Sequence, residues 1–406
     1  MYNGWLEYAG VEIMNAARTR AYVEKFLPRL SVVCPVTGLQ AARGHANYVS
    51  PAADNAPWYK STRAATGRFY GLFPGELEGA EDSTRTATII PLSSGGAVHG
   101  KPQYGSREVK ITALALAGDD EAMSEGIAWL KDTLSAGECA TSAGCSDNEM
   151  RMYANLPTDG LLDNHMLRSF LRVEVLDNVK VVKSYNTGTG LTGIVVAKRI
   201  TVIFSVGSPW AFTQKLAAGN VVLSTGTTFT DPVGEDCYAT NNAYADFIND
   251  PFYTAVAKPP QPPKVLPPNV IPVSSWRRKT LPVTQAEVDM WGRVTPVVTI
   301  STGAGGANQV RIRFYGDANA GCAFEGEFLI SYIPPNATMV IDSMRQQIKV
   351  VLSNGRTVPG GHLVYGSGGL PPKWPALGCR NTYTMTADML PGQTGITVYL
   401  ETSVRE

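Results

Sequence analysis

The alternation of apolar and polar positions from Arg107 to Leu116 predicts a β-strand, and a helical pattern follows it directly. In the strand, Val109, Ile111, Ala113 and Ala115 alternate with Lys110, Thr112, Leu114 and Leu116. In the helix, one buried stripe is expected from Met123, Ile127, Leu130 and Leu134, which follow the period of 3.6 residues. Asp119 is suited to cap the helix N-terminus, and Gly137 is the expected stop. The segment predicts a helix packed on a sheet.

Further strands are expected on either side of this unit. The first is a hairpin from Trp5 to Asn15, because Ala9-Gly10 is a turn dipeptide between two apolar-rich runs. The other expected strands are Thr84 to Pro91, Phe170 to Leu176 and Ile194 to Val206. The stretch from about Arg43 to Arg85 shows no regular period and is expected to be irregular.

Clean alternation returns in the last third of the chain. The runs are Val310, Ile312, Phe314; Phe328, Ile330, Tyr332; Ile348, Val350, Leu352; and Ile396, Val398, Leu400. Each run has one apolar and one polar face, as two antiparallel sheets packed face to face require. A short helical turn is expected from Thr284 to Met290. The fold class is therefore mainly β: a β-rich N-terminal domain with one packed α-helix, then an antiparallel β-sandwich.

The strongest boundary signal is residues 257–272, AKPPQPPKVLPPNVIP, where seven of sixteen residues are proline. Such a run favours an extended polyproline segment, either as a spacer between domains or as a strap along one surface. The expected domains are residues 1–256, a linker at 257–272, and residues 273–406.

Composition narrows the function classes. The chain has 406 residues, 44% of them hydrophobic, with 35 basic and 35 acidic side chains. Because binding to nucleic acid needs a basic balance or a dense Lys/Arg stripe, no nucleic-acid partner is expected. No run approaches the ~18 apolar residues of a membrane-spanning helix, and the N-terminus lacks the signal-peptide pattern, so no membrane anchor is expected.

Six cysteines leave three readings open: buried thiols, a disulfide, or part of a metal site. Cys139 and Cys145 are the only near neighbours, and they form the candidate disulfide, which would stabilise by roughly 2 to 3 kcal/mol in the loop-entropy model. None of the four histidines stands at the usual ligand spacing from them, so no metal or cofactor is expected.

Two sequence matches to nucleotide-binding motifs fail on their context. Gly188 to Gly193 fits GxGxxG, but a predicted strand follows where the dinucleotide fold needs a helix. Gly95 to Lys101 fits GxxxxGK, but Pro102 replaces the required Ser or Thr. The densest acidic patch, Glu76, Glu78, Glu81 and Asp82, is read as an exposed acidic face, with glycoside or peptidoglycan cleavage kept open as the alternative.

Two groups of aromatic residues are candidate contact sites. Trp58, Tyr59, Phe69, Tyr70 and Phe73 lie in the irregular stretch, where they either form a satellite core or contact a neighbouring subunit. Tyr365 and Trp374 flank Gly- and Pro-rich loops, where they either pack the sandwich edge or stack on sugar rings.

Three strings of the chain resemble a known family: YNGWLEYAGVEIMNAAR, REVKITALALAGDDEAMSEGIAWLKDTLSAGEC and FSVGSPWAF. They are similar to minor tail proteins of long-tailed phages that infect actinobacteria, and most similar to the distal tail protein. ISYIPPNATMVIDSMRQQIKV and HLVYGSGGLPPKWPALGC resemble the C-terminal part of the same proteins.

This resemblance implies a structural, non-enzymatic virion protein of the tail tip. It further implies a ring, usually of six copies, that joins the tail tube protein to the hub and other minor tail proteins. Residues 1–256 would build the ring, and residues 273–406 would form a galectin-like sandwich. The opening hairpin around Trp5 and Tyr8, with the aromatic stretch from Trp58 to Phe73, is the candidate subunit contact. The alternative is a lectin-like protein that binds host cell-wall glycan through Tyr365 and Trp374.

Overall fold

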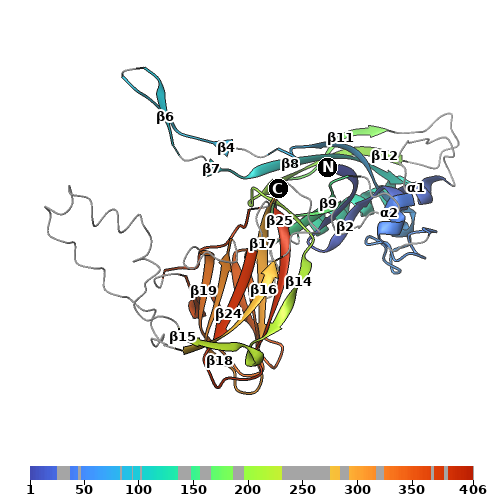
Figure 1. Cartoon of the computed structure of the whole chain (residues 1–406). Helices are drawn as coiled ribbons and strands as arrows, with labels where there is room; N and C mark the ends of the chain where they lie inside the picture. Colours follow the sequence, from blue (N-terminus) through green and yellow to red (C-terminus); the bar gives the residue numbers. More distant parts are fainter. Residues whose placement is uncertain are drawn as a thin grey trace. The chain divides into compact units, whose positions relative to one another are not determined.

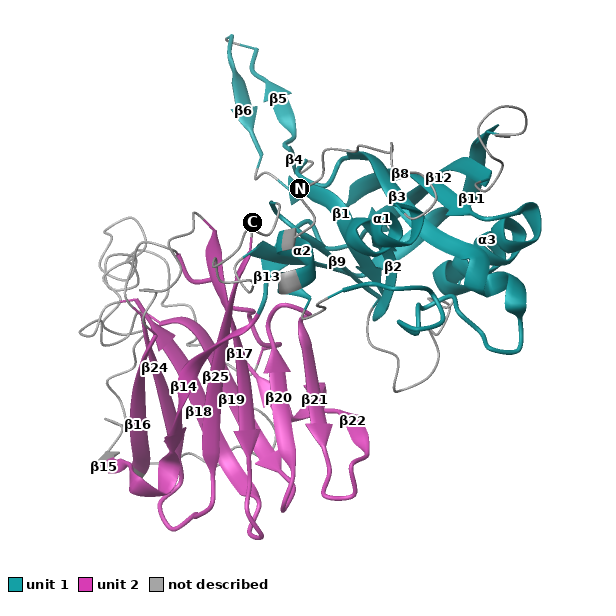
Figure 2. Cartoon of the chain, turned by 90° about the vertical axis from the view of Figure 1, so that its right-hand side faces the viewer, with its two compact units in different colours: residues 1–214 teal, residues 215–406 magenta. Residues whose placement is uncertain are grey.

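The computed structural model describes the chain in two compact units, Met1–Gln214 and Lys215–Glu406 (Figures 1 and 2). The described residues are 1–24, 37–43, 47–82, 85–93, 95–100, 103–135, 148–155, 166–185, 196–230, 275–283, 292–316, 324–366, 370–378 and 383–405.

In its described residues, unit 1 contains two antiparallel groups of strands and three α-helices. One group, in spatial order, is β2 (Val11–Asn15), β1 (Tyr2–Tyr8), β9 (Glu149–Tyr153), β10 (Leu167–Leu171) and β13 (Ala211–Thr213). The other is β11 (Val173–Tyr185), β12 (Val196–Val206), β8 (Arg107–Ala117) and β3 (Phe69–Glu78). The helical segments are α1 (Ala16–Glu24), α2 (Thr37–Ala42), the 3₁₀ turn η1 (Ala64–Arg68) and α3 (Asp120–Ser135).

The strand and helix expected from Arg107 onward are confirmed as β8 and α3. The Asp119 carboxylate accepts a hydrogen bond from the backbone N–H of Ala122 at 2.8 Å, as an N-cap does. Met123, Leu130 and Leu134 of the expected stripe are buried in the core of unit 1. The expected stop at Gly137 lies outside the described residues.

The opening hairpin is also confirmed, with Ala9 and Gly10 at its turn. Both turn residues have positive φ, 49° at Ala9 and 81° at Gly10, and glycine adopts that conformation without steric cost.

The stretch that was expected to be irregular contains a regular element. Phe69–Glu78 forms β3, which pairs with β8 and closes one edge of the four-stranded sheet. Its first five residues are all buried, so the period of two that identifies a half-exposed strand is absent. The helix α1 was not predicted either, because its sequence AARTRAYVE carries little amphipathic signal.

Unit 2 is an antiparallel β-sandwich, as the alternation predicted. One sheet has the order β14 (Leu216–Val222), β25 (Thr397–Arg405), β17 (Arg293–Ser301), β20 (Thr338–Asp342), β21 (Gln347–Val351), β22 (Thr357–Pro359). The other has the order β15 (Thr227–Thr230), β16 (Ser275–Val283), β24 (Tyr383–Met389), β18 (Ala307–Tyr315), β19 (Phe324–Ile333), β23 (Val364–Tyr365). Two 3₁₀ turns, η3 (Leu223–Thr225) and η4 (Gly361–Leu363), complete it. Apolar side chains of both sheets, among them Val298, Ile312, Met385 and Leu400, share one core.

Along the chain, unit 1 ends at Gln214 and unit 2 begins at Lys215. The sequence analysis had instead expected the domain boundary at the proline-rich segment. The physical reason is strand pairing: β14 pairs along β25, and β15 pairs with β16. Residues 216–230 therefore belong to the sandwich. The segment 257–272 and the expected turn from Thr284 to Met290 lie outside the described residues.

Candidate functional site

Trp5 and Tyr8, expected at a subunit contact, are fully buried inside unit 1. The indole N–H of Trp5 donates to Glu12 at 2.9 Å, and its ring centroid lies 5.3 Å from that of Tyr153. The Tyr8 ring packs 5.5 Å from the Phe204 ring, which joins the hairpin to β12. Burial, with the nearby Glu174 carboxylate, raises the pKa of Tyr8 to about 12. Both side chains build the core and present no surface to a neighbour.

The aromatic side chains between Trp58 and Phe73 also pack inside unit 1. Trp58, Phe69, Tyr70 and Phe73 are buried, and Tyr59 packs partly buried against them. The Trp58 N–H donates to the carbonyl oxygen of Phe69 at 2.8 Å, and its ring lies 5.5 Å from Trp129 of α3. These residues therefore belong to the main core of unit 1 instead of a satellite core, and a subunit contact through them stays a prediction.

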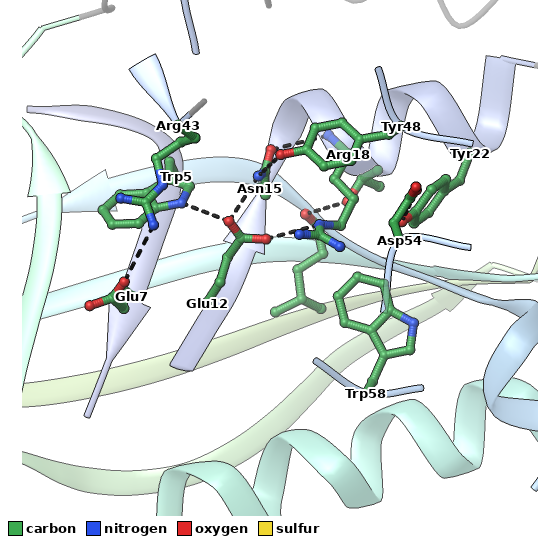
Figure 3. A network of polar contacts seen from close by, with 12 residues as sticks. Trp5, Glu7, Glu12, Asn15, Arg18, Tyr22, Arg43, Tyr48, Asp54 and Trp58 are labelled. Atoms are coloured by element: carbon green, nitrogen blue, oxygen red, sulfur yellow. Dashed lines mark hydrogen bonds and ion pairs between the residues drawn. The ribbon is translucent and has the colours of Figure 1, made fainter. Parts of the chain in front are cut away.

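A partly buried polar network lies beside this core (Figure 3). Glu12 accepts hydrogen bonds from Trp5 and Asn15 and pairs with the Arg18 guanidinium, each at 2.9 Å. Asn15 also caps α1, because its side-chain oxygen accepts from the Arg18 backbone N–H at 3.1 Å. Its amide N–H group donates to the Tyr48 hydroxyl.

Asp54 extends the network to the loop before β3. It accepts hydrogen bonds from the backbone N–H groups of Val49 and Ser50 and from the Tyr22 hydroxyl at 2.8 Å. Burial and the Asp54 bond raise the pKa of Tyr22 above its ordinary value. Each carboxylate of the network is held by several donors, which fixes β2, α1 and the loop to one another. The network therefore has a structural role.

The acidic patch on β3 and the turn after it is exposed and paired with cations. Glu76 lies 3.0 Å from the Arg199 guanidinium, and Glu78 lies 3.0 Å from the Lys110 ammonium. Glu81 pairs with the N-terminal amine of Met1. Among the described residues, no group of three or more His, Cys, Asp or Glu side chains could hold a metal ion. Among the described helices, none is both long enough and apolar enough to cross a membrane.

In unit 2, the two candidate sugar-contact residues make contacts within the chain. Trp374 is partly buried against the core, with its ring centroid 6.1 Å from that of Phe328. The Tyr365 hydroxyl donates to the carbonyl oxygen of His362 at 3.0 Å. Packing at the sandwich edge accounts for both side chains, and sugar binding there stays a prediction. The candidate disulfide, Cys139 with Cys145, lies outside the described residues.

A row of charges crosses the second sheet of unit 2 on the face opposite to its apolar core. Asp388 on β24 is fully buried between Arg278 on β16, at 2.7 Å, and Arg311 on β18, at 2.8 Å. The Arg311 guanidinium also lies over the Trp276 ring, 4.5 Å from its centroid. These contacts tie three neighbouring strands together and leave the carboxylate without access to a ligand.

The strand expected from Thr84 to Pro91 is present as β4 (Arg85–Thr86) and β5 (Ile89–Pro91), and it belongs to an exposed apolar hairpin whose exposure sequence reasoning missed. β4 pairs with β7 (Gln103–Tyr104), and β5 pairs with β6 (Ala97–His99). These ladders extend the β3–β8 hairpin beyond its sheet (Figure 2), and we call residues 85–93, 95–100 and 103–104 the arm. The available signal was the adjacent pair Ile89 and Ile90 followed by Gly95-Gly96 at the tip.

No family model and no curated protein matches the chain. Among solved structures, it is similar to the Dit protein of phage SPP1, described as a paradigm of the hub adsorption apparatus in phages infecting Gram-positive bacteria. That match has a TM-score of 0.40 and 10% identity, over 84% of this chain and 95% of that chain. A second match is a phage P2 baseplate structure in its activated conformation with Ca, with a TM-score of 0.41 and 8% identity, over 82% and 91%. TM-scores below 0.5 do not establish a shared fold.

Proposed function

We propose that this chain is a structural protein of a phage tail tip, of the distal-tail kind. The proposal rests on the position, within the fold, of the sequence that resembles the distal tail proteins. Arg107 to Ser135, the described part of the longest resembling string, forms β8 and α3. Strand β8 is paired on both sides, and α3 packs against the sheet that contains it. The resemblance therefore covers the elements that organise unit 1.

The site geometry supports assembly as the role, with no chemical step assigned. The carboxylates of Glu12 and Asp54, which are partly buried, and of Asp388, which is fully buried, hold structural partners, and Glu76 and Glu78 lie exposed in ion pairs. Such fixed pairs stiffen a scaffold, whereas general acid–base catalysis needs a carboxyl group within reach of a substrate.

The proposed assembly is a homo-oligomeric ring, six copies by the family resemblance, located in the virion. It would join the tail tube protein to the hub and other minor tail proteins. A closed ring requires a heterologous contact, in which two different surfaces of each copy meet.

The test is negative-stain electron microscopy of the purified full chain, with class averages examined for rotational symmetry. Closed rings with a central channel are expected. Native mass spectrometry gives the copy number independently of the images. A chain that stays monomeric at its highest soluble concentration, and that also fails to bind purified tail tubes, would contradict the proposal.

A further inference from the structure

The arm carries several largely exposed apolar side chains. Ile89 is 61% exposed and Ile90 is 56% exposed, and Leu92, Val98 and Tyr104 are also largely exposed. Because Ile89 and Ile90 are consecutive in a strand, they point to opposite faces, so the hairpin is apolar on both sides. An isolated two-stranded hairpin is marginally stable in water, and apolar exposure of this kind marks a contact surface.

An aromatic contact holds the base of the arm to the rest of unit 1. The Tyr104 ring lies 4.5 Å from the Trp210 ring, centroid to centroid, and the Arg85 guanidinium lies over Tyr104. Beyond this point, the described arm residues pair only with one another, with the tip turn closed by a hydrogen bond between Leu92 and Gly96.

A second exposed apolar patch lies on β11, also in unit 1. Leu176 is 58% exposed and Val182 is 56% exposed, with Val181 and Tyr185 largely exposed beside them. Strand β11 is an edge strand of its sheet in the described part of the chain. Its pairing with β12 shifts register three times. Such bulges oppose the addition of a regular strand, so a partner would pack on the side chains instead of extending the hydrogen-bond ladder.

We propose that the arm of one copy packs on the exposed side chains of β11 in a second copy of this chain. A heterologous contact needs two different and matching surfaces on each subunit, and unit 1 supplies both. The inference names the contact for the ring proposed above, but it stands on these exposed side chains alone.

Charge favours one direction for the arm along β11. Within residues 85–104 the sequence has no acidic residue, and Arg85 lies at the base of the arm beside Tyr104. On β11, the exposed Glu174 and Asp177 flank Leu176, whereas Lys180 and Lys183 flank the valine pair. The base of the arm would therefore lie at Leu176, and the tip, which has no lysine or arginine, at Val181 and Val182.

The experiment uses two full-chain variants purified separately: Ile89→Asp with Ile90→Asp in the arm, and Val181→Asp with Val182→Asp on β11. All four side chains are exposed, so each variant is expected to fold with wild-type circular dichroism. The matched control is Leu370→Asp, an exposed leucine of unit 2. Size-exclusion chromatography with light scattering measures mass.

The expected result is oligomers for the wild type and the control, and monomers for each double variant alone. Mixing the two variants should restore one contact, because one supplies an intact arm and the other an intact β11. The mixture should give a complex of twice the 43.5 kDa chain mass and nothing larger. Isologous contacts, arm to arm or β11 to β11, would not give a two-chain complex that forms only on mixing.

Three outcomes would overturn the inference: a monomeric wild type, oligomers that survive either double variant, or a mixture without the two-chain complex. Oligomeric rings that survive both variants would leave the tail-ring proposal standing. A two-chain complex from a protein that forms only open chains would support this contact and count against the closed ring.

Discussion

Asp388 combines complete burial with two arginine partners, so its charge matters more than that of any exposed carboxylate described above. Removing one partner of a buried ion pair leaves uncompensated charge in a low-dielectric region. Asp388→Asn should therefore lower the free energy of unfolding of unit 2 by about 3 kcal/mol. Urea denaturation followed by tryptophan fluorescence measures this, because Trp276 lies beside Arg311.

Glu78→Gln is the matched control, since Glu78 pairs with Lys110 on the surface of unit 1. Exposed pairs contribute about 0 to 1 kcal/mol. Equal losses in the two variants would show that burial of Asp388 does not have the assigned effect.

Asp119 predicts a pH dependence. Its pKa lies below the ordinary value, chiefly because the Ala122 N–H donates to the carboxylate, with the Arg68 guanidinium adding to the effect. A carboxyl group with a lowered folded-state pKa stabilises the fold above its unfolded pKa of about 3.9, and this contribution is lost as the pH falls through the folded value.

Asp119→Ala should cost about 1 kcal/mol at neutral pH, the usual value of a helix N-cap. The difference from wild type should shrink as the pH falls below about 4. Asp119→Asn keeps a capping oxygen and serves as the control. Chemical denaturation at a series of pH values makes the comparison, and a difference that is constant or grows in acid would contradict the assignment.

At the scale of elements, the packing of α3 on β3 depends on the absence of a side chain at Gly126. A Cβ atom there would lie 2.2 Å from the Phe69 ring, which is itself buried against Trp58. Replacing glycine by alanine in a helix usually gains about 1 kcal/mol. Gly126→Ala should instead destabilise unit 1, by about 1 to 3 kcal/mol, because overpacking outweighs the gain in helix propensity.

Thermal unfolding followed by circular dichroism measures this change. Ser124→Ala, at an exposed position two residues earlier in α3, is the control and should leave the melting temperature nearly unchanged. A higher melting temperature for Gly126→Ala would show that α3 does not pack closely on Phe69.

At the scale of the whole molecule, the position of the boundary between units is itself testable. A fragment of residues 215–406 retains β14 and β15, whereas a fragment of residues 273–406 loses both. Loss of β14 exposes the edge of β25, and exposed sheet edges promote aggregation. The longer fragment should therefore unfold cooperatively at the higher temperature, and the shorter one should be less soluble. Equal stability and solubility of the two fragments would contradict this assignment.

Periodic patterns accounted for several of the helices and strands. β8, α3, the opening hairpin and the sandwich strands β18, β19, β21 and β25 were predicted because their apolar residues repeat at the spacing of their own secondary structure. Strand β3 and helix α1 were missed because the first half of β3 is buried on both faces and α1 is only weakly amphipathic, so that repeat is absent.

For the candidate contact residues, residue type alone did not decide between a buried and an exposed position. Aromatic residues are favoured both in cores and at interfaces, so their identity did not decide between the two for Trp5, Tyr8 and Trp58. The tertiary structure placed all three in the core, and it showed that Ile89 and Ile90 of the arm are the exposed apolar residues.

The sequence by itself determined the mainly β class, the capped helix α3 and the alternation of the sandwich, because these depend on residues close together in the chain. Only the tertiary structure decided where the units divide, which aromatic residues are covered, and that Asp388 lies between two arginines. Those features depend on pairings between distant residues, such as β14 with β25, and a local pattern does not specify which distant strands pair.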